Sequence, residues 1–394
     1  MNLYIDFFSA LPQSGGVKYH GGGGYTRNVV TALVGQKRKD VNICVLCPEW
    51  FAPTEECEPE LARYKDIIWV NVKSPDEYSG YKEGDIVYYP MLGYLYELKE
   101  IVKLRKKFPY LKLCATLHDI RFLEYTADWT EKYYETGIKR LLFPVYSFCV
   151  NNWAKKIIKG PALRDCLEAL DEVYTVSNYS MQKILQQNRN AKISLYYQTV
   201  KAKEDLSCGN IVSSEYVLFV SGARPVKNLT HALLAFSKYK MEHMYDDKKM
   251  VITGITDEQF HRLCDVPGVD YNLMKQYCVT MGYVSAEELA ALYKYCRFVL
   301  YTSKNEGFGL PVLEAASYGK TCVASNVASI PEVIGDAVRY VNPLNDDMIA
   351  DAISFFDSDA NLEDYERRVS ESWSYLCERM ETDQKNFIND LLRQ

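Results

Sequence analysis

The sequence predicts an α/β protein with two doubly wound, Rossmann-like domains that face each other across a cleft. At 394 residues the chain is too long for one ordinary hydrophobic core. Short, nearly all-apolar strand patterns alternate with longer helical patterns, which is typical of parallel sheets covered on both faces. The alternation pauses at the polar stretch 200–215 and then starts again. We therefore predict an N-terminal domain over 1–203, a C-terminal domain over 204–371, and a last helix, 372–394, that packs back on the first domain.

The strand and helix patterns form two series along the chain. The first predicts strands at 2–8, 41–47, 66–72, 85–91, 112–119, 172–177 and 193–197, with helices at 26–35, 94–108 and 179–188. The second predicts strands at 214–222, 249–254, 278–284, 297–303 and 321–326, with helices at 228–240, 285–296, 310–318 and 329–335. Because ligands of such sheets bind at the carboxyl ends of the strands, residues that follow a strand are candidates for a site.

The composition indicates a soluble globular protein, with 48% apolar and 25% charged residues. A net charge of −6 gives no support to nucleic-acid binding by the whole chain. The 12 cysteines are scattered through apolar patterns, and the start lacks a cationic region before its apolar run, so we expect reduced thiols in a cytosolic protein. Cys44-x-x-Cys47 lies inside a strand pattern and is expected to be core packing. No apolar run approaches the roughly 18 residues of a membrane span.

The segment "SKNEGFGLPVLEAASYG", 303–319, places two glutamates around a glycine-rich turn that follows a strand. Pro311 suits the first position of a helix, and Gly319 suits the residue just past its end. A helix that begins there has a partly positive end that attracts phosphate or a sugar hydroxyl. The backbone candidates for that contact are Gly307, Phe308, Gly309 and Leu310. A lone glutamate here would most often be solvated, but the pair Glu306 and Glu314 indicates function.

This segment and its continuation, "EGFGLPVLEAASYGKTCVASNVASIPEVIGDAVRYVNP", resemble the signature of the family-4 retaining glycosyltransferases. The E-x7-E spacing and the trailing "NP" correspond. The resemblance implies the GT-B fold and a relationship to bacterial mannosyl- and glucosyltransferases of surface-polysaccharide synthesis. It also implies that Glu306 contacts the donor sugar, whereas Glu314 holds the ribose hydroxyls of the nucleotide.

Arg224 and Lys227 follow the first strand of the second series, and Asn228 is a plausible N-cap of the next helix. Two cations beside a helix start suit a diphosphate, although such residues taken alone are more often solvated. The family's pattern resembles G-x-x-x-P-R-K-N, and this chain departs from it. Val226 stands before Lys227, and the arginine comes two residues earlier. The resemblance therefore implies a phosphate-binding role for Lys227, and Arg224 is a displaced candidate for the same role.

Four consecutive glycines follow the first strand, in "YHGGGGYTRNVVTAL" at 19–33. Glycines permit close backbone approach to a ligand, but a flexible surface loop is an equal alternative. The resemblance implies a loop near the donor phosphates and the acceptor. The run does not distinguish among Gly22, Gly23 and Gly24.

His118 and Asp119 end a strand of the first domain, in "CATLHD". None of the other four histidines has a comparable setting in the sequence, so His118 is our candidate catalytic histidine. This stretch resembles the T-x-H-D motif of the family, which lies opposite the donor. The resemblance therefore implies that Asp119 lies on the acceptor side. Ser177 ends a later strand and is either an acceptor-side residue or only an N-cap.

Two further expectations concern the nucleotide and the membrane. Base recognition is expected to use backbone groups around Tyr283 and Val284. No carboxylate or histidine cluster has metal spacing, so we expect no metal and no cofactor beyond a nucleotide-sugar co-substrate. The segments 96–108 and 139–160 interleave basic and aromatic residues. They are either amphipathic core helices with a solvated basic face, which is the commoner case, or a surface that contacts anionic lipid.

The predicted function is transfer of a hexose from a UDP- or GDP-sugar to a hydroxyl of a glycan or a lipid-linked acceptor, with retention. The candidate catalytic residues are Glu306, His118, Lys227 and Arg224. Two alternatives stay open: a module that only binds a nucleotide sugar or glycan, and another GT-B enzyme such as an epimerase. The expected location is the cytoplasm, including the inner face of the membrane. The sequence carries no indication of oligomeric state.

Overall fold

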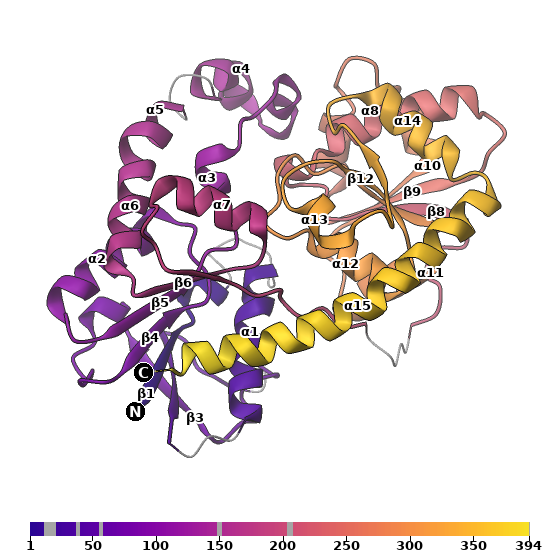
Figure 1. The fold of residues 1–394 in the computed structure, drawn as a ribbon. Helices are drawn as coiled ribbons and strands as arrows, with labels where there is room; N and C mark the ends of the chain where they lie inside the picture. Colours follow the sequence, from indigo (N-terminus) through magenta and orange to yellow (C-terminus); the bar gives the residue numbers. More distant parts are fainter. Residues whose placement is uncertain (12–20, 37–39, 55–57, 148–151, 203–207, 394) are drawn as a thin grey trace. The chain divides into compact units, whose positions relative to one another are not determined.

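A computed structural model describes residues 1–11, 21–36, 40–54, 58–147, 152–202 and 208–393. The chain folds into two compact units, and each has its own sheet flanked by helices (Figure 1). Unit 1 comprises Met1–Leu123, Ala154–Thr199 and Arg379–Gln394. Unit 2 comprises Glu124–Trp153 and Val200–Glu378.

Unit 1 contains a seven-stranded sheet in the order β3-β2-β1-β4-β5-β6-β7, and every pair in it is parallel. Six of these strands lie within a predicted range, and β2 extends one residue beyond its range, to Pro48. The bounds are β1 Asn2–Asp6, β2 Asn42–Pro48, β3 Ile67–Val72, β4 Ile86–Tyr89, β5 Lys112–Thr116, β6 Glu172–Thr175 and β7 Ile193–Leu195.

Helices cover both faces of this sheet because apolar side chains alternate along its strands and point both ways. Leu3 and Ile5 of β1 pack on one face with α1 (Gly21–Gly35), whereas Tyr4 packs on the other face. The second face also receives α2 (Leu95–Lys107) and α6 (Gly160–Ala169). The other helical elements that begin within unit 1 are η1 Phe8–Ala10, η2 Pro75–Glu77, α3 Arg121–Glu124, η5 Lys155–Lys159 and α7 Asn178–Gln187.

Cys44 and Cys47 are core residues, as predicted. Both thiols are buried and free, and they belong to the clusters on opposite faces of the sheet. Burial raises the pKa of each thiol to about 11. A pair three residues apart in a strand cannot form a bridge or share a metal, because the two side chains point in opposite directions.

Unit 2 contains a six-stranded parallel sheet in the order β10-β9-β8-β11-β12-β13. The strands are β8 Tyr216–Phe219, β9 Lys249–Thr253, β10 Cys278–Met281, β11 Phe298–Tyr301, β12 Cys322–Ser325 and β13 Arg339–Val341. The helical elements between and after them are η6 Pro225–Lys227, α8 Leu229–Glu242, α9 Asp257–Leu263, α10 Tyr271–Tyr277, α11 Ala286–Tyr295, α12 Leu310–Ser317, α13 Ile330–Ile334 and α14 Asp346–Phe355. The sequence patterns did not predict α9, α10, β13 or α14.

The two sheets share one topology. In each, the chain starts in the middle, runs to one edge, and then returns to fill the other side. The reversal lies between β1 and β4 in unit 1 and between β8 and β11 in unit 2. Open α/β sheets bind ligands at such a switch point, beyond the carboxyl ends of the two strands. The topology therefore selects two loop pairs for a site.

The segment 124–153, which the sequence patterns place within the N-terminal domain, belongs to unit 2. It includes η3 (Trp129–Tyr134) and α4 (Gly137–Val145), and α5 (Asn152–Ala154) begins at its end. Tyr133 lies in the main apolar core of unit 2. The hydroxyl of Tyr134 accepts a hydrogen bond from the amide of Leu229, at 3.0 Å. The segment is attached to unit 2 by these tertiary contacts.

The last helix, α15, runs from Asp359 to Leu391, so it begins 13 residues before the predicted range. Its portion from Arg379 onward belongs to unit 1. There Phe387, Ile388 and Leu391 pack in the same cluster as Leu3 of β1. Across the described ranges, no helix combines the length and the apolar character needed to cross a bilayer.

Candidate functional site

The switch point of unit 2 brings together the loops that follow β8 and β11. Hydrogen bonds join the two loops directly. The amide of Lys304 donates to the carbonyl of Val226 at 2.8 Å, and the hydroxyl oxygen of Ser303 lies 3.1 Å from the same carbonyl oxygen. Thr302 donates to the carbonyl of Asn228 at 3.3 Å. These contacts place Lys227 of one loop against Glu306 of the other.

Lys227 and Glu306 form a buried ion pair, with 2.7 Å between Nζ and Oε1. Lys227 is 5% exposed and Glu306 is 7% exposed. Tyr301 lies 3.0 Å from the same Nζ atom, and the hydroxyl of Ser303 donates to Oε1 of Glu306 at 2.5 Å. A buried charge pair is tolerated when further hydrogen bonds satisfy both partners, as they do here. The sequence patterns did not single out Tyr301 or Ser303.

Glu314 lies in the second turn of α12 and is half-buried. Tyr293 of α11 donates a hydrogen bond to its Oε2 atom at 2.7 Å. Burial raises the pKa of the Glu314 carboxyl, while the hydrogen bond from Tyr293 and the charge of Lys227 act in the opposite direction. Lys227 thus interacts electrostatically with both glutamates of the motif. The sequence patterns did not identify Tyr293.

Helix α12 begins and ends as predicted. It starts at Leu310, after Gly309 at the N-cap with a φ of +95°, and Pro311 is its second residue. At the other end Gly319 adopts a φ of +72°. The amide of Lys320 donates to the carbonyl of Ala315 at 3.0 Å, and the amide of Gly319 donates to Ala316 at 2.9 Å. This pair of bonds is the Schellman ending of a helix. Gly307 and Phe308, whose backbone groups are also candidates for contact with a phosphate or a sugar hydroxyl, are buried and follow Glu306 directly in the chain.

Asn228 holds the predicted N-cap position of α8, but its side chain forms no capping hydrogen bond. Its φ is +66°, in the left-handed region, whereas a capping residue is typically extended. The side-chain nitrogen Nδ2 of Asn228 donates instead to the carbonyl of Pro343 at 2.6 Å. Tyr134 accepts from the amide of Leu229 in its place. The donor-binding role of Asn228 stays a prediction.

Arg224 and Lys227 differ in their surroundings, although only two residues separate them. Lys227 is buried, whereas the side chain of Arg224 is exposed at the start of η6. Tyr283 and Val284 lie in the loop between β10 and α11, where Tyr283 is 57% exposed and Val284 is half-buried. Contact of these residues with a nucleotide stays a prediction.

The 124–134 segment adds charged residues beside the Glu306 loop. Lys304 forms an ion pair with Asp128 at 2.8 Å and another with Glu131. Burial favours the neutral acid, but the charge of Lys304 and hydrogen bonds from Lys304 and Thr130 lower the pKa of Asp128. The loop that carries Glu306 is therefore held from two sides, by Val226 through the backbone and by this segment through Lys304.

His231 also has a setting that the sequence concealed. It is buried, its Nδ1 atom lies 2.6 Å from Asp346, and its Nε2 atom lies 3.7 Å from Asp128. The expectation that His118 alone among the histidines has a suggestive setting is therefore wrong. Asp128 and Asp346 are distant from His231 in the sequence, so the local pattern contained no sign of this arrangement.

The switch point of unit 1 brings the start of α1 near the loops after β4 and β5. Helix α1 begins at Gly21, so Gly22, Gly23 and Gly24 form its first turn and do not precede it as a loop. A Cβ atom on Gly23 would lie 2.8 Å from the carbonyl oxygen of Ala10, which requires glycine there. Tyr19 and His20 lie outside the described residues.

The imidazole of His118 is half-buried, and its surroundings favour the neutral form. Burial lowers its pKa, and its Nε2 atom lies 3.1 Å from the carbonyl oxygen of Pro90, so this nitrogen carries the proton. The ring of Tyr25 meets the imidazole edge-on, with 4.5 Å between centroids. The Tyr25 hydroxyl lies 3.3 Å from the hydroxyls of both Tyr88 and Thr116. These contacts fix the ring of His118 between α1 and the strand ends.

Asp119 and Ser177 each have a local structural contact. Asp119 accepts from the amide of Arg121 at 2.9 Å and pairs with its guanidinium at 3.0 Å. Ser177 is the N-cap of α7 and accepts from the amide of Ser180 at 3.1 Å. Ser180 in turn donates to the carbonyl of His118 at 2.8 Å. The N-cap alternative for Ser177 is confirmed, and its acceptor-side role stays a prediction.

Comparison with known proteins shows which family the region around this site resembles. Residues 208–372 match the family described as "Glycosyl transferases group 1". The O-antigen chain mannosyltransferase RfbU of Salmonella typhimurium is 26% identical over 300 residues, which is 73% of this chain and 80% of RfbU. The serotype-specific mannosyltransferase WbdA of Escherichia coli is 29% identical over 175 residues, which is 44% of this chain and 19% of WbdA. The matched part of the chain thus spans about a fifth of the length of WbdA.

Solved structures show the same architecture. A glycosyltransferase from Rickettsia africae ESF-5 superposes with a TM-score of 0.65 at 14% identity, over 100% of this chain and 99% of that one. The trehalose-6-phosphate synthase OtsA superposes with a TM-score of 0.67 at 12% identity, also over 100% of this chain and 99% of that one. At these identities the likeness shows the fold alone, which is GT-B. Residues 208–372 of unit 2, which include the Lys227–Glu306 pair, therefore match the glycosyl transferases group 1 family, and the fold is GT-B.

Proposed function

We propose that this protein is a retaining glycosyltransferase that moves a hexose from a nucleoside-diphosphate sugar to a hydroxyl of a glycan or a lipid-linked acceptor. The buried Lys227–Glu306 pair at the switch point of unit 2 carries the proposal. Fixed charges held out of water interact strongly with charge that develops during a reaction. The names of the relatives favour mannose as the hexose.

In this proposal Lys227 and Arg224 bind the diphosphate of the donor. Lys227 is supported in that role by its burial and by its electrostatic interaction with both glutamates. Arg224 is exposed in the same loop, so it is free of the packing that holds Lys227 and can move to a phosphate. Both cations would stabilise the negative charge that builds on the leaving diphosphate.

The two glutamates would divide the rest of the donor between them. Glu306 contacts the sugar, and its carboxylate is already oriented by Ser303 and Lys227. Glu314 accepts hydrogen bonds from the ribose hydroxyls, as a carboxylate does in dinucleotide sites. The hydroxyl of Tyr293 donates to Oε2 of Glu314, and this hydrogen bond orients the Glu314 carboxylate. The base contacts the loop around Tyr283.

Unit 1 supplies the acceptor side in this proposal. His118 is neutral and its Nε2 proton is held by Pro90, so its role is hydrogen bonding to the acceptor and not proton donation from an imidazolium. The diphosphate oxygen takes the proton of the acceptor hydroxyl, on the same face of the sugar that it leaves. We propose that no metal ion and no further cofactor takes part.

We also propose that the protein works in the cytoplasm at the inner face of a membrane. An exposed apolar stripe on α4 supports this placement. It repeats at helical spacing over two turns, and each of its side chains is more than half exposed: Ile138, Leu141, Leu142, Val145 and Tyr146. Such a stripe beside basic residues is the pattern of a helix that lies on a lipid surface.

A thermal-shift panel of UDP-, GDP- and ADP-sugars, including mannose donors, tests the donor. The preferred donor should raise the melting temperature by mass action, because it binds only the folded protein. A panel in which no donor shifts the transition and none is turned over contradicts the proposal.

The variant Glu306→Gln separates an enzyme from a binding module. It keeps the shape of the side chain, so we expect the donor shift to persist while turnover falls by at least about 100-fold. The matched control is Glu378→Gln, at an exposed glutamate of unit 2, which should leave both readouts unchanged. A wild-type protein that binds donor and turns nothing over is a binding module, and interconversion of free donor sugars would identify an epimerase.

A further inference from the structure

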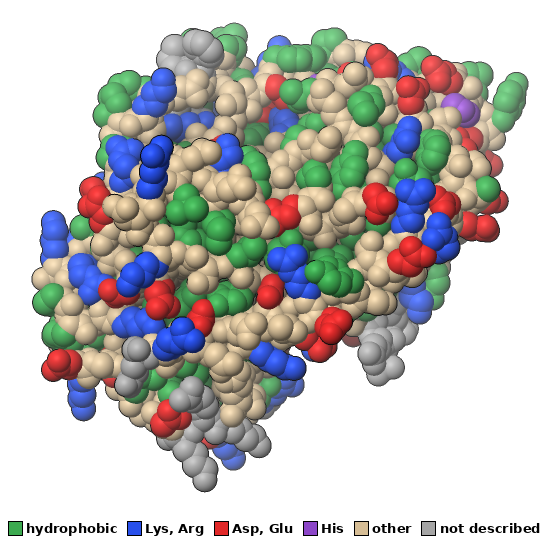
Figure 2. All heavy atoms as spheres, in the orientation of Figure 1, with side chains coloured by type: hydrophobic (Ala, Val, Ile, Leu, Met, Phe, Trp, Pro, Cys, Tyr) green, Lys and Arg blue, Asp and Glu red, His purple; other side chains and the backbone are tan. Residues whose placement is uncertain are grey.

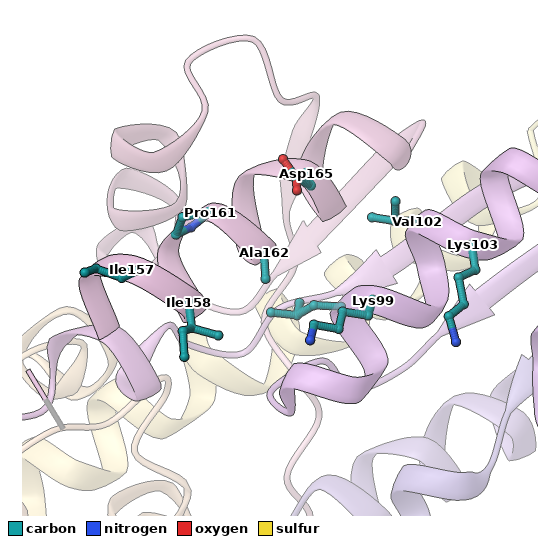
Figure 3. Close-up of a pocket in the computed structure, with 9 residues that line it drawn as sticks. Lys99, Val102, Lys103, Ile157, Ile158, Pro161, Ala162 and Asp165 are labelled. Carbon is teal, nitrogen blue, oxygen red and sulfur yellow. The ribbon is translucent and has the colours of Figure 1, made fainter. Parts of the chain in front are cut away.

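Unit 1 has a surface groove between α2 on one side and η5 and α6 on the other (Figure 3). Its volume is about 450 Å³, which is within the range of small-molecule sites. Figure 3 shows Ile158 and Ala162 on the side that faces Lys99 of α2. The lining residues are Leu98, Lys99, Val102, Lys103, Ile157, Ile158, Pro161, Ala162 and Asp165.

The floor of the groove is apolar and open to solvent. Leu98 and Val102 are one helical turn apart on α2, so they line the same side. The opposite side exposes Ile157 at 57% and Ile158 at 38%. Two adjacent isoleucines at the edge of an apolar hollow leave a hydrophobic surface that a ligand can cover.

The rim of the groove is basic. Lys99 and Lys103 are one turn apart on α2, and both are exposed. Asp165 is the acidic side chain in the lining. Glu100, the neighbour of Lys99, contributes little negative charge near neutral pH, because burial raises its pKa to about 8. Figure 2 shows hydrophobic and basic side chains intermixed over the region of α5 and α6.

We propose that this groove binds an anionic phospholipid at a bilayer surface. Lys99 and Lys103 bind the headgroup phosphate, and the apolar floor receives the upper part of an acyl chain. The pairing of a basic rim with an apolar floor fits a ligand that is itself anionic at one end and apolar at the other. A soluble phosphate would leave the isoleucines exposed. The proposal rests on the membrane placement proposed above but not on sugar transfer, because lipid binding is measured without a donor.

The first test is co-sedimentation of the full-length protein with vesicles. We expect binding to equimolar phosphatidylglycerol and phosphatidylcholine, and about tenfold weaker binding to phosphatidylcholine alone, since each lysine near an anionic surface contributes to attraction. Binding should weaken as salt rises from 0.05 to about 0.5 M, because the screening length shortens. Equal binding to both vesicles overturns the proposal.

Charge reversal locates the site. Lys99→Glu with Lys103→Glu should lower vesicle binding by about tenfold. The matched control, Lys65→Glu with Lys82→Glu, makes the same change of net charge at two exposed lysines of unit 1 outside the groove. Binding that falls equally in both pairs reflects only net charge and overturns the assignment. Circular dichroism confirms that each variant is folded.

The apolar floor has its own variants. Ile157→Ser with Ile158→Ser, and separately Ala162→Trp to fill the groove, should each weaken binding about fivefold while every lysine stays in place. Ile211→Ser with Leu344→Ser, at exposed apolar residues of unit 2, is the matched control. Full binding by the Ala162→Trp protein would show that the groove takes no lipid. A dimer that the isoleucine variant dissociates would assign this face to a second copy and overturn the proposal.

Discussion

The Nζ atom of Lys227 lies 2.7 Å from Oε1 of Glu306, although 79 residues separate the two in the sequence. The parallel sheet is the cause of this proximity, because β8 and β11 are neighbours and both end at the same edge. Backbone hydrogen bonds between the two loops then fix the distance. The pair is therefore a property of the fold of unit 2 and persists without a ligand.

Removing one partner of this pair should destabilise unit 2. Lys227→Met leaves the Glu306 carboxylate buried without its cation, and Glu306→Gln leaves the Lys227 ammonium without its anion. We expect each change to lower the free energy of unfolding by about 3 kcal/mol, the usual cost of breaking a buried pair. Hydrogen exchange of the amides in β8 and β11 measures this for unit 2 alone.

The double variant distinguishes an ion pair from two independent contributions. Lys227→Met with Glu306→Gln should cost clearly less than the sum of the single changes, with a coupling of about 1–3 kcal/mol. Additive costs would mean that the two side chains are stabilised separately, by Tyr301 and Ser303, and would contradict the pair as the main interaction.

The start of α8 should depend on Tyr134, although this residue lies far away in the sequence. Its hydroxyl accepts at 3.0 Å from the amide of Leu229, one of the first amides of α8, which have no partner within the helix. Tyr134→Phe should therefore destabilise unit 2 by about 1 kcal/mol in urea unfolding, as the loss of a cap does. Tyr245→Phe is the control, because that ring is 98% exposed. Equal urea midpoints for the two variants would contradict this prediction, because they would show that water replaces the lost hydroxyl of Tyr134.

The elements of the fold could be predicted because they depend on short-range patterns. Every strand that the sequence predicts lies in one of the two sheets, since a buried parallel strand must be apolar on both faces. The same holds for the ends of α12, where Gly309 and Gly319 adopt positive φ values. The pairing of Lys227 with Glu306 was accessible too, because both follow strands that the topology makes neighbours.

The rest of the site could not be read from local patterns. Tyr134, Asp128 and Glu131 are bound to unit 2 by contacts with residues about a hundred or more positions away. Nothing in their own segment distinguishes them from surface residues. Asn228 is the predicted N-cap but lacks the side-chain capping bond for a related reason, since the conformation of that loop is set by tertiary contacts. Tertiary context therefore overrode local propensity at these positions.

Gly319 should be required for its backbone conformation and not for space. Its φ is +72°, and a Cβ atom there would have no neighbour within 4 Å. Gly319→Ala should therefore cost about 1 kcal/mol in urea unfolding, from left-handed strain alone. Gly319→Asn should cost less, because asparagine tolerates this region. Gly24→Ala is the control, since Gly24 has negative φ and also lacks close neighbours. An alanine variant as stable as the wild type would contradict the strained ending.

The stability of unit 1 should fall as pH rises, because several of its carboxyls hold their protons unusually tightly. Burial, reinforced by the charge of Asp6, raises the pKa of Glu100 from 4.5 to about 8, against an opposing hydrogen bond from Tyr89. Burial likewise raises the pKa of Glu97 to about 7 and that of Asp6 to about 6. Between the ordinary and the raised values the folded state binds more protons than the unfolded state. The free energy of unfolding therefore decreases from about pH 4.5 to about pH 8 and then levels off.

Glu100→Gln removes the largest of these shifts and keeps an acceptor for the Tyr89 hydroxyl, which now lies 2.8 Å from Oε1. We expect the variant to match the wild type at pH 4.5 and to exceed it by about 1–2 kcal/mol at pH 8.5, after allowance for the partial exposure of Glu100. Hydrogen exchange of the β4 amides, compared at the same pH, reports on unit 1 alone. Glu168→Gln, at an exposed glutamate of α6, is the control. A variant that gains no stability between the two pH values would show that Glu100 ionises normally in the folded protein.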